Sequence, residues 1–219
     1  MRLPRGVGGY VANTTNAMIS RCQFVNNSCN NNGGGGLLLN GTENTLVQNC
    51  LITGNSATNS QGGVGGAGIY VVTNNVLIEN CTITSNTLVN KITSKGGGLY
   101  APRTGVSVVN SIIYYNQHAG STSSNYYVSA GTTFSNSCTA PTNGLTGTAN
   151  TEANPQFVAK ESGNFHLLSG SPCINAGLVQ DWMRAAQDLD GRPRLDRFSG
   201  QVDMGCYEYI PRGALFGGR

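Results

Sequence analysis

Carboxylates are the side chains that would carry chemistry in a chain so poor in other reactive groups. A pair of carboxylates can hydrolyse a glycosidic bond, and a cluster can hold Ca²⁺ beside a base that removes a proton. The 219-residue chain has 10 acidic residues, but the stretch up to Asn125 contains only Glu43 and Glu79. These two occupy different places in the repeat described below. The sequence therefore predicts no catalytic residue in this stretch.

The remaining acidic residues gather near the C-terminus among arginines. The segment Asp188–Gly191, "DLDG", has its glycine at the fourth place, whereas an EF-hand loop has it at the sixth. We expect a turn in which Asp–Arg pairs fix a capping segment. A surface Ca²⁺ near Asp188 and Asp190 is the alternative that the sequence leaves open, and no other cofactor is expected. The residues concerned are Asp181, Asp188, Asp190, Asp196, Asp203 and Glu208, with Arg184, Arg192, Arg194 and Arg197.

Histidine and cysteine show no metal-binding spacing. His118 and His166 lie in unrelated contexts, and the 7 cysteines form no zinc motif. An odd number of cysteines leaves at least one thiol free or paired between chains. Cys138 and Cys173 lie outside the repeat, and we interpret them as a disulfide-linked pair in an oxidising compartment. The glycine run Gly33–Gly36 is not followed by Lys-Ser/Thr and a helix, so it is not a phosphate loop.

The frame N-C-x-I-T-x-N recurs along the chain. Asn49–Asn55 reads "NCLITGN" and Asn80–Asn86 reads "NCTITSN", while Arg21–Asn27 and Asn110–Asn116 are weaker copies. Each copy follows a glycine cluster and an apolar run. A period of about 30 residues without a helical stretch indicates that each repeat is one coil of a solenoid. We predict three short strands per coil and an all-β, right-handed parallel β-helix of four to five coils.

Stacking of such coils at about 4.8 Å would align like residues in columns. We expect a cysteine column to face the core as small apolar filling beside isoleucine. We expect one asparagine column to turn a corner between two strands and a second to close the third strand. The cysteine column is Cys22, Cys50 and Cys81; the corner column is Asn49, Asn80 and Asn110; the closing column is Asn27, Asn55, Asn86 and Asn116.

Composition excludes several classes of protein. Only 11% of residues are charged and the net charge is +3, so no nucleic-acid footprint is visible. No stretch approaches the ~18–20 apolar residues of a transmembrane helix. The start, "MRLPRGVGGY", lacks the apolar region of a signal peptide, and we interpret the chain as a fragment or a processed form.

The repeats and the C-terminal motifs together resemble a known class of protein. The glycine clusters, corner asparagines and closing asparagines resemble right-handed parallel β-helix repeat proteins of bacterial surfaces. The segments Asn154–Gly177, Asp188–Arg194 and Val202–Tyr209 resemble the choice-of-anchor Q domain that closes such proteins. The resemblance implies an exported, extracellular or cell-surface protein of poorly known activity. We expect repeats over residues 1–134 and a capping segment over residues 135–219.

Variable loops on one side of the coils are the place where we expect binding. They are Asn26–Gly34, Asn55–Gly66, Asn86–Gly97 and Asn116–Asn125. Tyrosines near them suit stacking on sugars, although ordinary packing is the simpler interpretation. The candidate ligand-binding residues are Tyr70, Tyr100, Arg103, Tyr114, Tyr115 and His118.

We therefore expect a non-catalytic scaffold or adhesion module outside the cell, which stacks end to end and binds polysaccharide. The alternative is a polysaccharide lyase or glycoside hydrolase. A groove in which two carboxylates converge with an arginine or lysine would favour the enzyme. A flat face of asparagine, serine and tyrosine would favour the scaffold.

Overall fold

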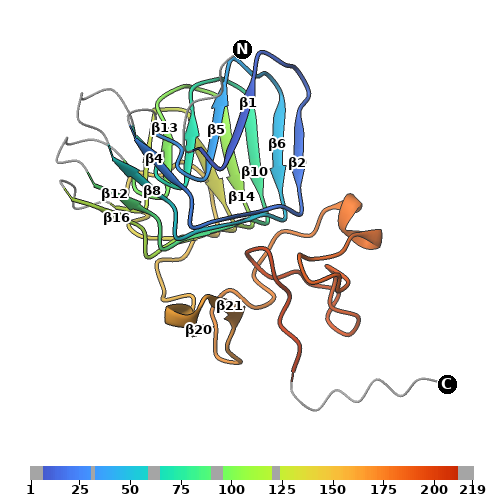
Figure 1. The fold of residues 1–219 in the computed structure, drawn as a ribbon. Coiled ribbons are helices and arrows are strands. Elements are labelled where there is room, and N and C mark those ends of the chain that lie inside the picture. Colours follow the sequence, from blue (N-terminus) through green and yellow to red (C-terminus); the bar gives the residue numbers. More distant parts are fainter. Residues whose placement is uncertain (1–6, 31–32, 59–64, 90–95, 120–123, 212–219) are drawn as a thin grey trace.

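The computed structural model describes residues 7–30, 33–58, 65–89, 96–119 and 124–211. Up to residue 139 the chain winds into a parallel β-helix whose coils stack one behind another (Figure 1). Four complete coils are followed by a partial fifth. The predicted all-β parallel solenoid is confirmed.

Each of the four complete coils contributes one strand to each of four parallel sheets, and the partial fifth coil contributes one strand to each of the first three. The first sheet contains β1 (Gly9–Ala12), β5 (Leu37–Asn40), β9 (Ile69–Val71), β13 (Leu99–Ala101) and β17 (Tyr126–Val128). The second contains β2 (Met18–Ser20), β6 (Thr45–Gln48), β10 (Val76–Glu79), β14 (Val106–Val109) and β18 (Thr133–Ser135). The third contains β3 (Gln23–Val25), β7 (Leu51–Thr53), β11 (Thr82–Thr84), β15 (Ile112–Tyr114) and β19 (Cys138–Thr139). The fourth contains β4 (Ser28–Asn30), β8 (Ser56–Thr58), β12 (Thr87–Leu88) and β16 (Gln117–His118).

The fourth sheet corrects the prediction of three strands per coil. Its strands begin directly after the closing asparagines, in segments that the sequence analysis assigned to variable loops. Cys29, Ala57 and Leu88 are buried in register on neighbouring strands, and the residues that flank them are more exposed. Two or three alternating residues are too few to show a strand period in the sequence. The loop residues 31–32, 59–64, 90–95 and 120–123 lie outside the described residues.

The core lies between the first three sheets. Ile52, Ile83 and Ile113 stack in register in the third sheet and are fully buried. Valine and isoleucine of the second sheet face them across the interior. Because parallel coils place like residues directly above one another, the apolar pattern of one coil is repeated by the next.

In the cysteine column, Cys50 and Cys81 are buried and Cys22 is partly buried, and the thiols also make hydrogen bonds. The thiols of Cys50 and Cys81 donate to the carbonyl oxygens of the residues two places earlier, at 3.2 and 3.3 Å. In the next coil Ser111 Oγ makes the same bond, to Val109 O, at 2.9 Å. The position therefore takes a small side chain that can donate a hydrogen bond, which explains why serine replaces cysteine there.

The closing asparagines form a continuous buried ladder. The Nδ2 group of Asn27 donates to Oδ1 of Asn55 at 2.9 Å, and the same bond joins Asn55 to Asn86 and Asn86 to Asn116, also at 2.9 Å. Each of these acceptor oxygens also receives the backbone N–H of the preceding asparagine. A second Nδ2 proton of Asn86 binds the carbonyl of Ile52 at 3.0 Å. The ladder thus satisfies side chains that would be costly to bury unpaired.

The corner asparagines differ from the closing ones in backbone conformation. Asn49, Asn80 and Asn110 have φ values of 52°, 48° and 51°, in the left-handed region that asparagine tolerates. Their side chains point out of the coil. Only a long contact of 3.4 Å links Asn110 Nδ2 to Asn80 Oδ1, so this column is not primarily a ladder of its own.

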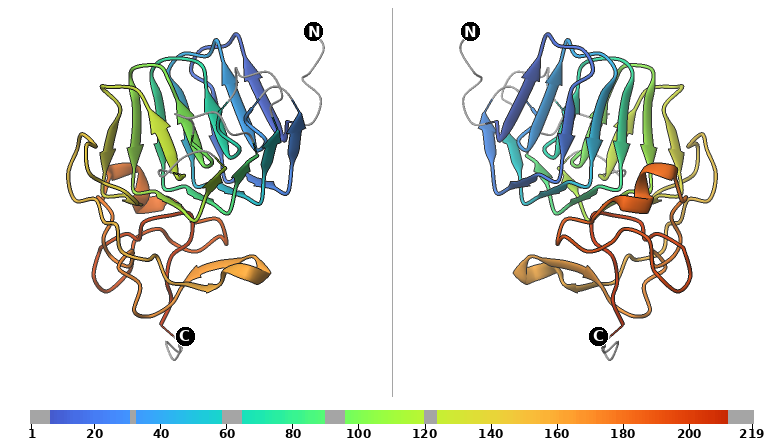
Figure 2. Two further views of the ribbon diagram at one scale, coloured as in Figure 1. Left: turned by 90° about the vertical axis from the view of Figure 1, so that its left-hand side faces the viewer. Right: turned by 90° about the vertical axis from the view of Figure 1, so that its right-hand side faces the viewer.

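The tail, residues 140–211, begins by covering the end of the solenoid. Thr146 and Thr151 form isolated parallel bridges with Thr133 and Cys138, in β18 and β19. The remainder turns back and lies beneath the coils, along the outer face of the third sheet (Figures 1 and 2). The tail therefore contacts both the last coil and the third sheet.

The tail has little regular structure of its own. It contains an antiparallel pair, β20 (Phe157–Ala159) and β21 (Asn164–Leu167), and short 3-10 helices at Lys160–Ser162 and Asp181–Ala185. Neither these nor any other helix in the described part of the chain is long and apolar enough to cross a membrane.

The corner asparagines hold the tail against the coils. The amide groups of four successive corners donate to backbone carbonyls of the tail at 2.9 to 3.3 Å. The donor and acceptor residues are Asn49 and Gln187, Asn80 and Asp203, Asn110 and Leu178, and Asn136 and Ala176. The repeat therefore specifies both the corner and the attachment of the tail.

Candidate functional site

A column of tyrosines lies on the outer side of the first sheet. Tyr70 of β9 is in register with Tyr100 of β13, which is in register with Tyr127 of β17. The ring centroids are 5.1 and 5.5 Å apart, with the rings tilted by 39° and 37°. Leu38 and Tyr10 continue the same column toward β1. Three neighbouring strands of the first sheet thus each contribute one phenol ring to the column.

Accessibility varies along the tyrosine column. Tyr127 is 38% exposed, whereas Tyr100 is only 8% exposed. Tyr70 is intermediate; its burial raises the pKa of its hydroxyl, and the nearby charge of Arg103 opposes that rise. A ligand would therefore reach Tyr127 and Tyr70 more readily than the ring between them.

Tyr114 and Tyr115 do not join this column. Tyr114 donates its hydroxyl to Glu152 O at 3.0 Å, and Tyr115 donates to Asn154 Oδ1 at 2.7 Å. The Lys160 ammonium lies 4.9 Å from the centre of the Tyr115 ring. Both residues pack against the tail, which is the ordinary packing that the sequence analysis gave as the simpler interpretation.

His118 also lies away from the tyrosines. It is 5% exposed and occupies the inward-facing position of the fourth sheet, in register with Leu88. The structure therefore brings together Tyr70, Tyr100 and Arg103 from the predicted set, and it adds Tyr127.

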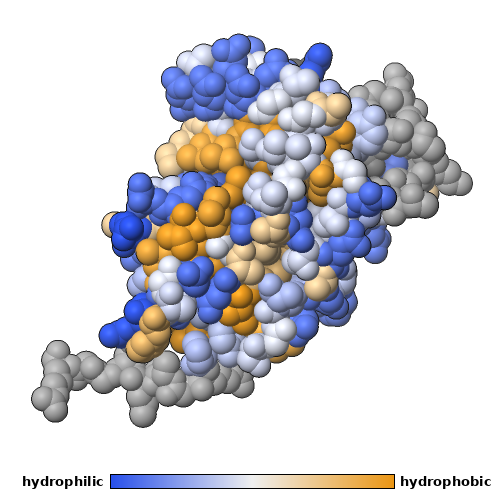
Figure 3. All heavy atoms as spheres, turned by 180° about the vertical axis from the view of Figure 1, so that it is seen from behind, coloured by the Kyte–Doolittle hydropathy of each residue, from blue (hydrophilic) through white to orange (hydrophobic). Residues whose placement is uncertain are grey.

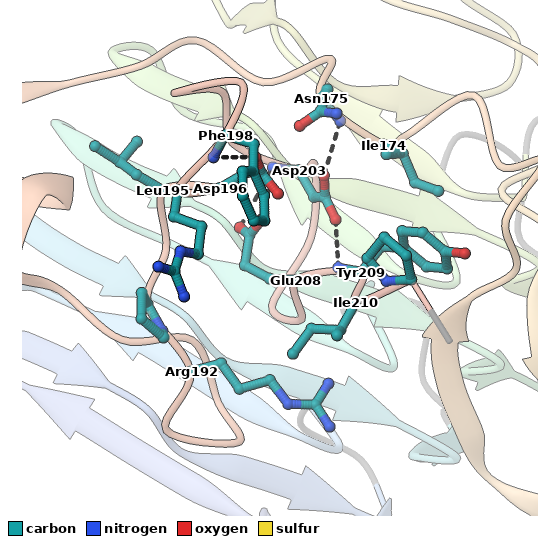
Figure 4. A pocket seen from close by; sticks show the side chains of 13 residues that line it. Ile174, Asn175, Arg192, Leu195, Asp196, Phe198, Asp203, Glu208, Tyr209 and Ile210 are labelled. Carbon is teal, nitrogen blue, oxygen red and sulfur yellow. Dashed lines mark hydrogen bonds between the residues drawn. The ribbon is translucent and has the colours of Figure 1, made fainter. Parts of the chain in front are cut away.

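A pocket of about 290 Å³ in the tail was not expected from the sequence. Ile174, Leu195, Phe198 and Ile210 contribute apolar walls, and the carboxyl groups of two buried residues lie among them (Figure 4). These residues are Asp203, 2% exposed, and Glu208, 6% exposed. Carboxylates in a largely apolar pocket are a recognised mark of a functional site.

The two carboxyl groups are already bound by the chain itself. Asp203 accepts the backbone N–H groups of Asn175 at 2.7 Å and Tyr209 at 2.6 Å. Glu208 accepts the backbone N–H of Asp203 at 3.1 Å. These bonds join the segment around Asn175 to the segment from Asp203 to Tyr209, so the carboxyl groups have a clear structural role.

A fully buried guanidinium completes this network. Arg194 is 0% exposed and donates to Glu208 Oε1 at 2.9 Å and to the carbonyls of Asp203 and Gly205 at 3.0 and 3.1 Å. Burial raises the pKa of Asp203 and raises that of Glu208 to about 9, although the charge of Arg194 opposes both shifts. The buried ion pair beneath the pocket is thus Glu208–Arg194, whereas the Asp–Arg pairs of the tail, Asp181–Arg184 at 3.8 Å and Asp190–Arg192 at 3.6 Å, are more exposed.

The carboxylates of Asp188 and Asp190 bind groups of the chain itself. The carboxylate of Asp188 accepts the backbone N–H groups of Arg192 at 2.7 Å and Glu208 at 2.9 Å. Asp190 pairs with His166 at 2.7 Å and with Arg192 at 3.6 Å. Over the described ranges, no group of three or more His, Cys, Asp or Glu residues is arranged to hold a metal ion.

The tail also exposes apolar side chains. Figure 3 shows apolar residues in a diagonal band, crossed by polar ones, on the face opposite to that of Figure 1. Exposed apolar residues mixed with polar ones are common on protein surfaces, so this band alone indicates no partner. The exposed large apolar residues of the tail are Val158, Leu168, Leu178, Val179 and Phe198.

Comparisons of the chain with protein-family models, with curated proteins and with solved structures found no match.

Proposed function

We propose that this chain is a non-catalytic extracellular scaffold that binds polysaccharide along the tyrosine column. The observation that carries the proposal is the stacking of Tyr70, Tyr100 and Tyr127 in register at 5.1 and 5.5 Å. An extended glycan offers one pyranose ring after another, and sugar rings stack on aromatic faces. The sheet beneath is a continuous parallel sheet of paired strands, so the rings are fixed before a ligand arrives, and binding costs little ordering.

The resemblance of the C-terminal motifs to a choice-of-anchor Q domain supports a location at the bacterial surface. In that setting the tail would face other components of the envelope, while the first sheet stays free for a glycan. The firm attachment of the tail through four corner asparagines fits a module that must stay folded outside the cell.

Affinity electrophoresis and calorimetry with a panel of neutral and acidic polysaccharides test the proposal. Tyr127→Ala should weaken binding about 2- to 13-fold, because an aromatic contact contributes roughly 0.5–1.5 kcal/mol. Leu168→Ala is the control, since Leu168 is an exposed apolar residue of the tail, 45% accessible, that does not line the tail pocket. Binding that Tyr127→Ala leaves unchanged would count against the column.

A second candidate function, polysaccharide cleavage, is favoured by the tail pocket. Two carboxyl groups and an arginine converge there, which is the arrangement that the sequence analysis set as the mark of an enzyme. We prefer the scaffold because the bonds of Asp203 and Glu208 to the backbone occupy the oxygens that chemistry would use. Cleavage of any polysaccharide in the panel, abolished by Glu208→Gln in a variant that remains folded, would reverse this preference.

Copies of the chain are also proposed to stack end to end. β1, β2, β3 and β4 are the outermost strands of their sheets within the described residues. Unpaired edge strands are ready templates for another strand. Analytical ultracentrifugation over a range of concentrations should show association, and a monomer at high concentration would contradict it.

A further inference from the structure

Two cysteines meet where the tail packs against the solenoid. Cys138 belongs to β19, the last strand of the third sheet, and Cys173 belongs to the tail. Both are 0% exposed and lie in one apolar cluster with Phe157, Phe165 and Met204. Both are free thiols, and the Cys138 thiol donates to Ala153 O at 3.2 Å. Contact with the Cys173 thiol and burial raise the pKa of Cys138. Two thiols from elements far apart in the sequence thus meet in one buried cluster.

The cysteine column of the coils differs from this pair. Cys22, Cys50 and Cys81 stack in register on neighbouring coils, so their Cβ atoms are about 4.8 Å apart. A disulfide needs Cβ atoms about 3.5–4.5 Å apart with converging directions. Parallel side chains at this spacing are poorly arranged for a disulfide.

We propose that Cys138 and Cys173 form a disulfide that fastens the tail to the last strand of the third sheet. The two thiols give up two protons and two electrons, and a disulfide oxidant such as oxidised glutathione takes up the electrons. One thiolate attacks the glutathione disulfide and releases one glutathione, and the second thiolate displaces the other. The products are one protein disulfide and two reduced glutathione molecules. This inference stands apart from glycan binding by the tyrosine column.

Burial determines when the bond forms. An oxidant cannot reach two fully buried sulfurs in the docked state, and burial together with the contact between the thiols disfavours the reactive thiolate of Cys138. The oxidation therefore belongs to folding, before the tail closes over β19. Once formed, the bond is shielded from reductants in the same way.

The test is refolding of the full chain from urea in a mixture of reduced and oxidised glutathione, followed by non-reducing tryptic mapping. Lys160 lies between the two cysteines, so trypsin separates their peptides unless a disulfide joins them. We expect one cross-linked peptide pair and an intact mass lower by two hydrogen atoms. Recovery of Cys138 and Cys173 as alkylated free thiols, or of a different pair, would overturn the proposal.

Thermal unfolding gives a second measurement. A disulfide of this kind should raise the midpoint of the oxidised protein by about 5–10 °C over the reduced protein. Cys138→Ser, Cys173→Ser and the double variant should lose this difference to the same extent. Cys206→Ser is the matched control, because Cys206 is buried in the same cluster and should keep the cross-link. Equal midpoints for the oxidised and reduced wild type would contradict the proposal.

Discussion

Asparagine has two roles in this chain, and the backbone decides which. At the corners, the left-handed conformation of Asn49, Asn80 and Asn110 turns the side chain outward, where it binds carbonyls of the tail. At the strand ends, Asn55 and Asn86 point inward and bind one another. In the frame N-C-x-I-T-x-N, the first asparagine thus binds the tail and the last asparagine binds the equivalent asparagine of the next coil.

Replacement of a closing asparagine should cost much more than that of an exposed one. Asn86→Ala removes a buried amide and leaves the backbone N–H of Asn55 and the carbonyl of Ile52 without this partner, so we expect a loss of about 2–4 kcal/mol of unfolding free energy. Asn40→Ala, at an exposed strand end, serves as the control. Urea denaturation measures both, and equal losses would show that the ladder contributes little.

The tail carboxyl groups should make stability depend on pH. The pKa of Glu208 rises from 4.5 to about 9 on folding, so between these values the folded state binds more protons than the unfolded state. Stability should therefore fall as the pH rises through this range. Asp203, whose pKa is also raised, acts in the same direction. Urea midpoints across this range should fall for the wild type and fall less for Glu208→Gln. An identical slope in the two proteins would argue against Glu208 as the source.

At the scale of elements, the glycine clusters allow the first sheet to stack. Gly68 comes so close to the next coil that a Cβ there would lie 2.5 Å from the carbonyl oxygen of Gly98 and 3.0 Å from the ladder amide of Asn86. The first neighbour is a backbone atom and the second is a hydrogen-bonded side chain of the ladder, so neither can move away easily. The glycines therefore mark close approach between coils.

Gly68→Ala should consequently destabilise the solenoid. Overpacking of this kind costs about 1–3 kcal/mol or more, because coil spacing must increase locally. Gly170→Ala is a suitable control, since the nearest atom to its Cβ would be the side-chain oxygen of Gln156, at 3.1 Å. Thermal unfolding of both variants provides the comparison. A Gly68→Ala protein as stable as the control would show that the coils can separate at little cost.

The coils could be predicted from the sequence because the same residue pattern recurs in each repeat. Asn80–Asn86 and Asn49–Asn55 align residue by residue, and register follows from that alignment. The fourth strand was missed because a segment such as Thr87–Leu88 is too short to display alternation. Tyr127 was missed as a member of the tyrosine column because β17 belongs to a partial coil with an irregular interval.

The tail was harder to predict because nothing in it repeats. Its position depends on contacts between distant residues, such as the bond from the backbone N–H of Cys206 to Thr82 Oγ1 at 3.1 Å. The pocket depends on Asp203 and Glu208, which could be recognised in the sequence only as acidic residues near arginines. Their burial and their backbone partners are properties of the folded chain.

At the scale of the whole molecule, the lateral position of the tail affects how the protein unfolds. A solenoid alone is held by contacts between neighbouring coils, and its ends can fray independently. Here one tail spans several coils, from Leu51 of β7 to Cys138 of β19, through a shared apolar cluster and the corner asparagines. Coils and tail therefore stabilise one another across the length of the third sheet.

We accordingly expect the coils and the tail to unfold in a single transition. The chain has 1 tryptophan, Trp182, and it lies in the tail helix Asp181–Ala185, so its fluorescence reports the tail. Far-ultraviolet circular dichroism reports mainly the strands of the coils. The two signals should give superimposable urea curves, as cooperative unfolding requires. Asn80→Gly keeps the left-handed corner but removes the bond to Asp203, and it should shift both curves together. A fluorescence change at lower urea than the dichroism change would show instead that the tail detaches from intact coils.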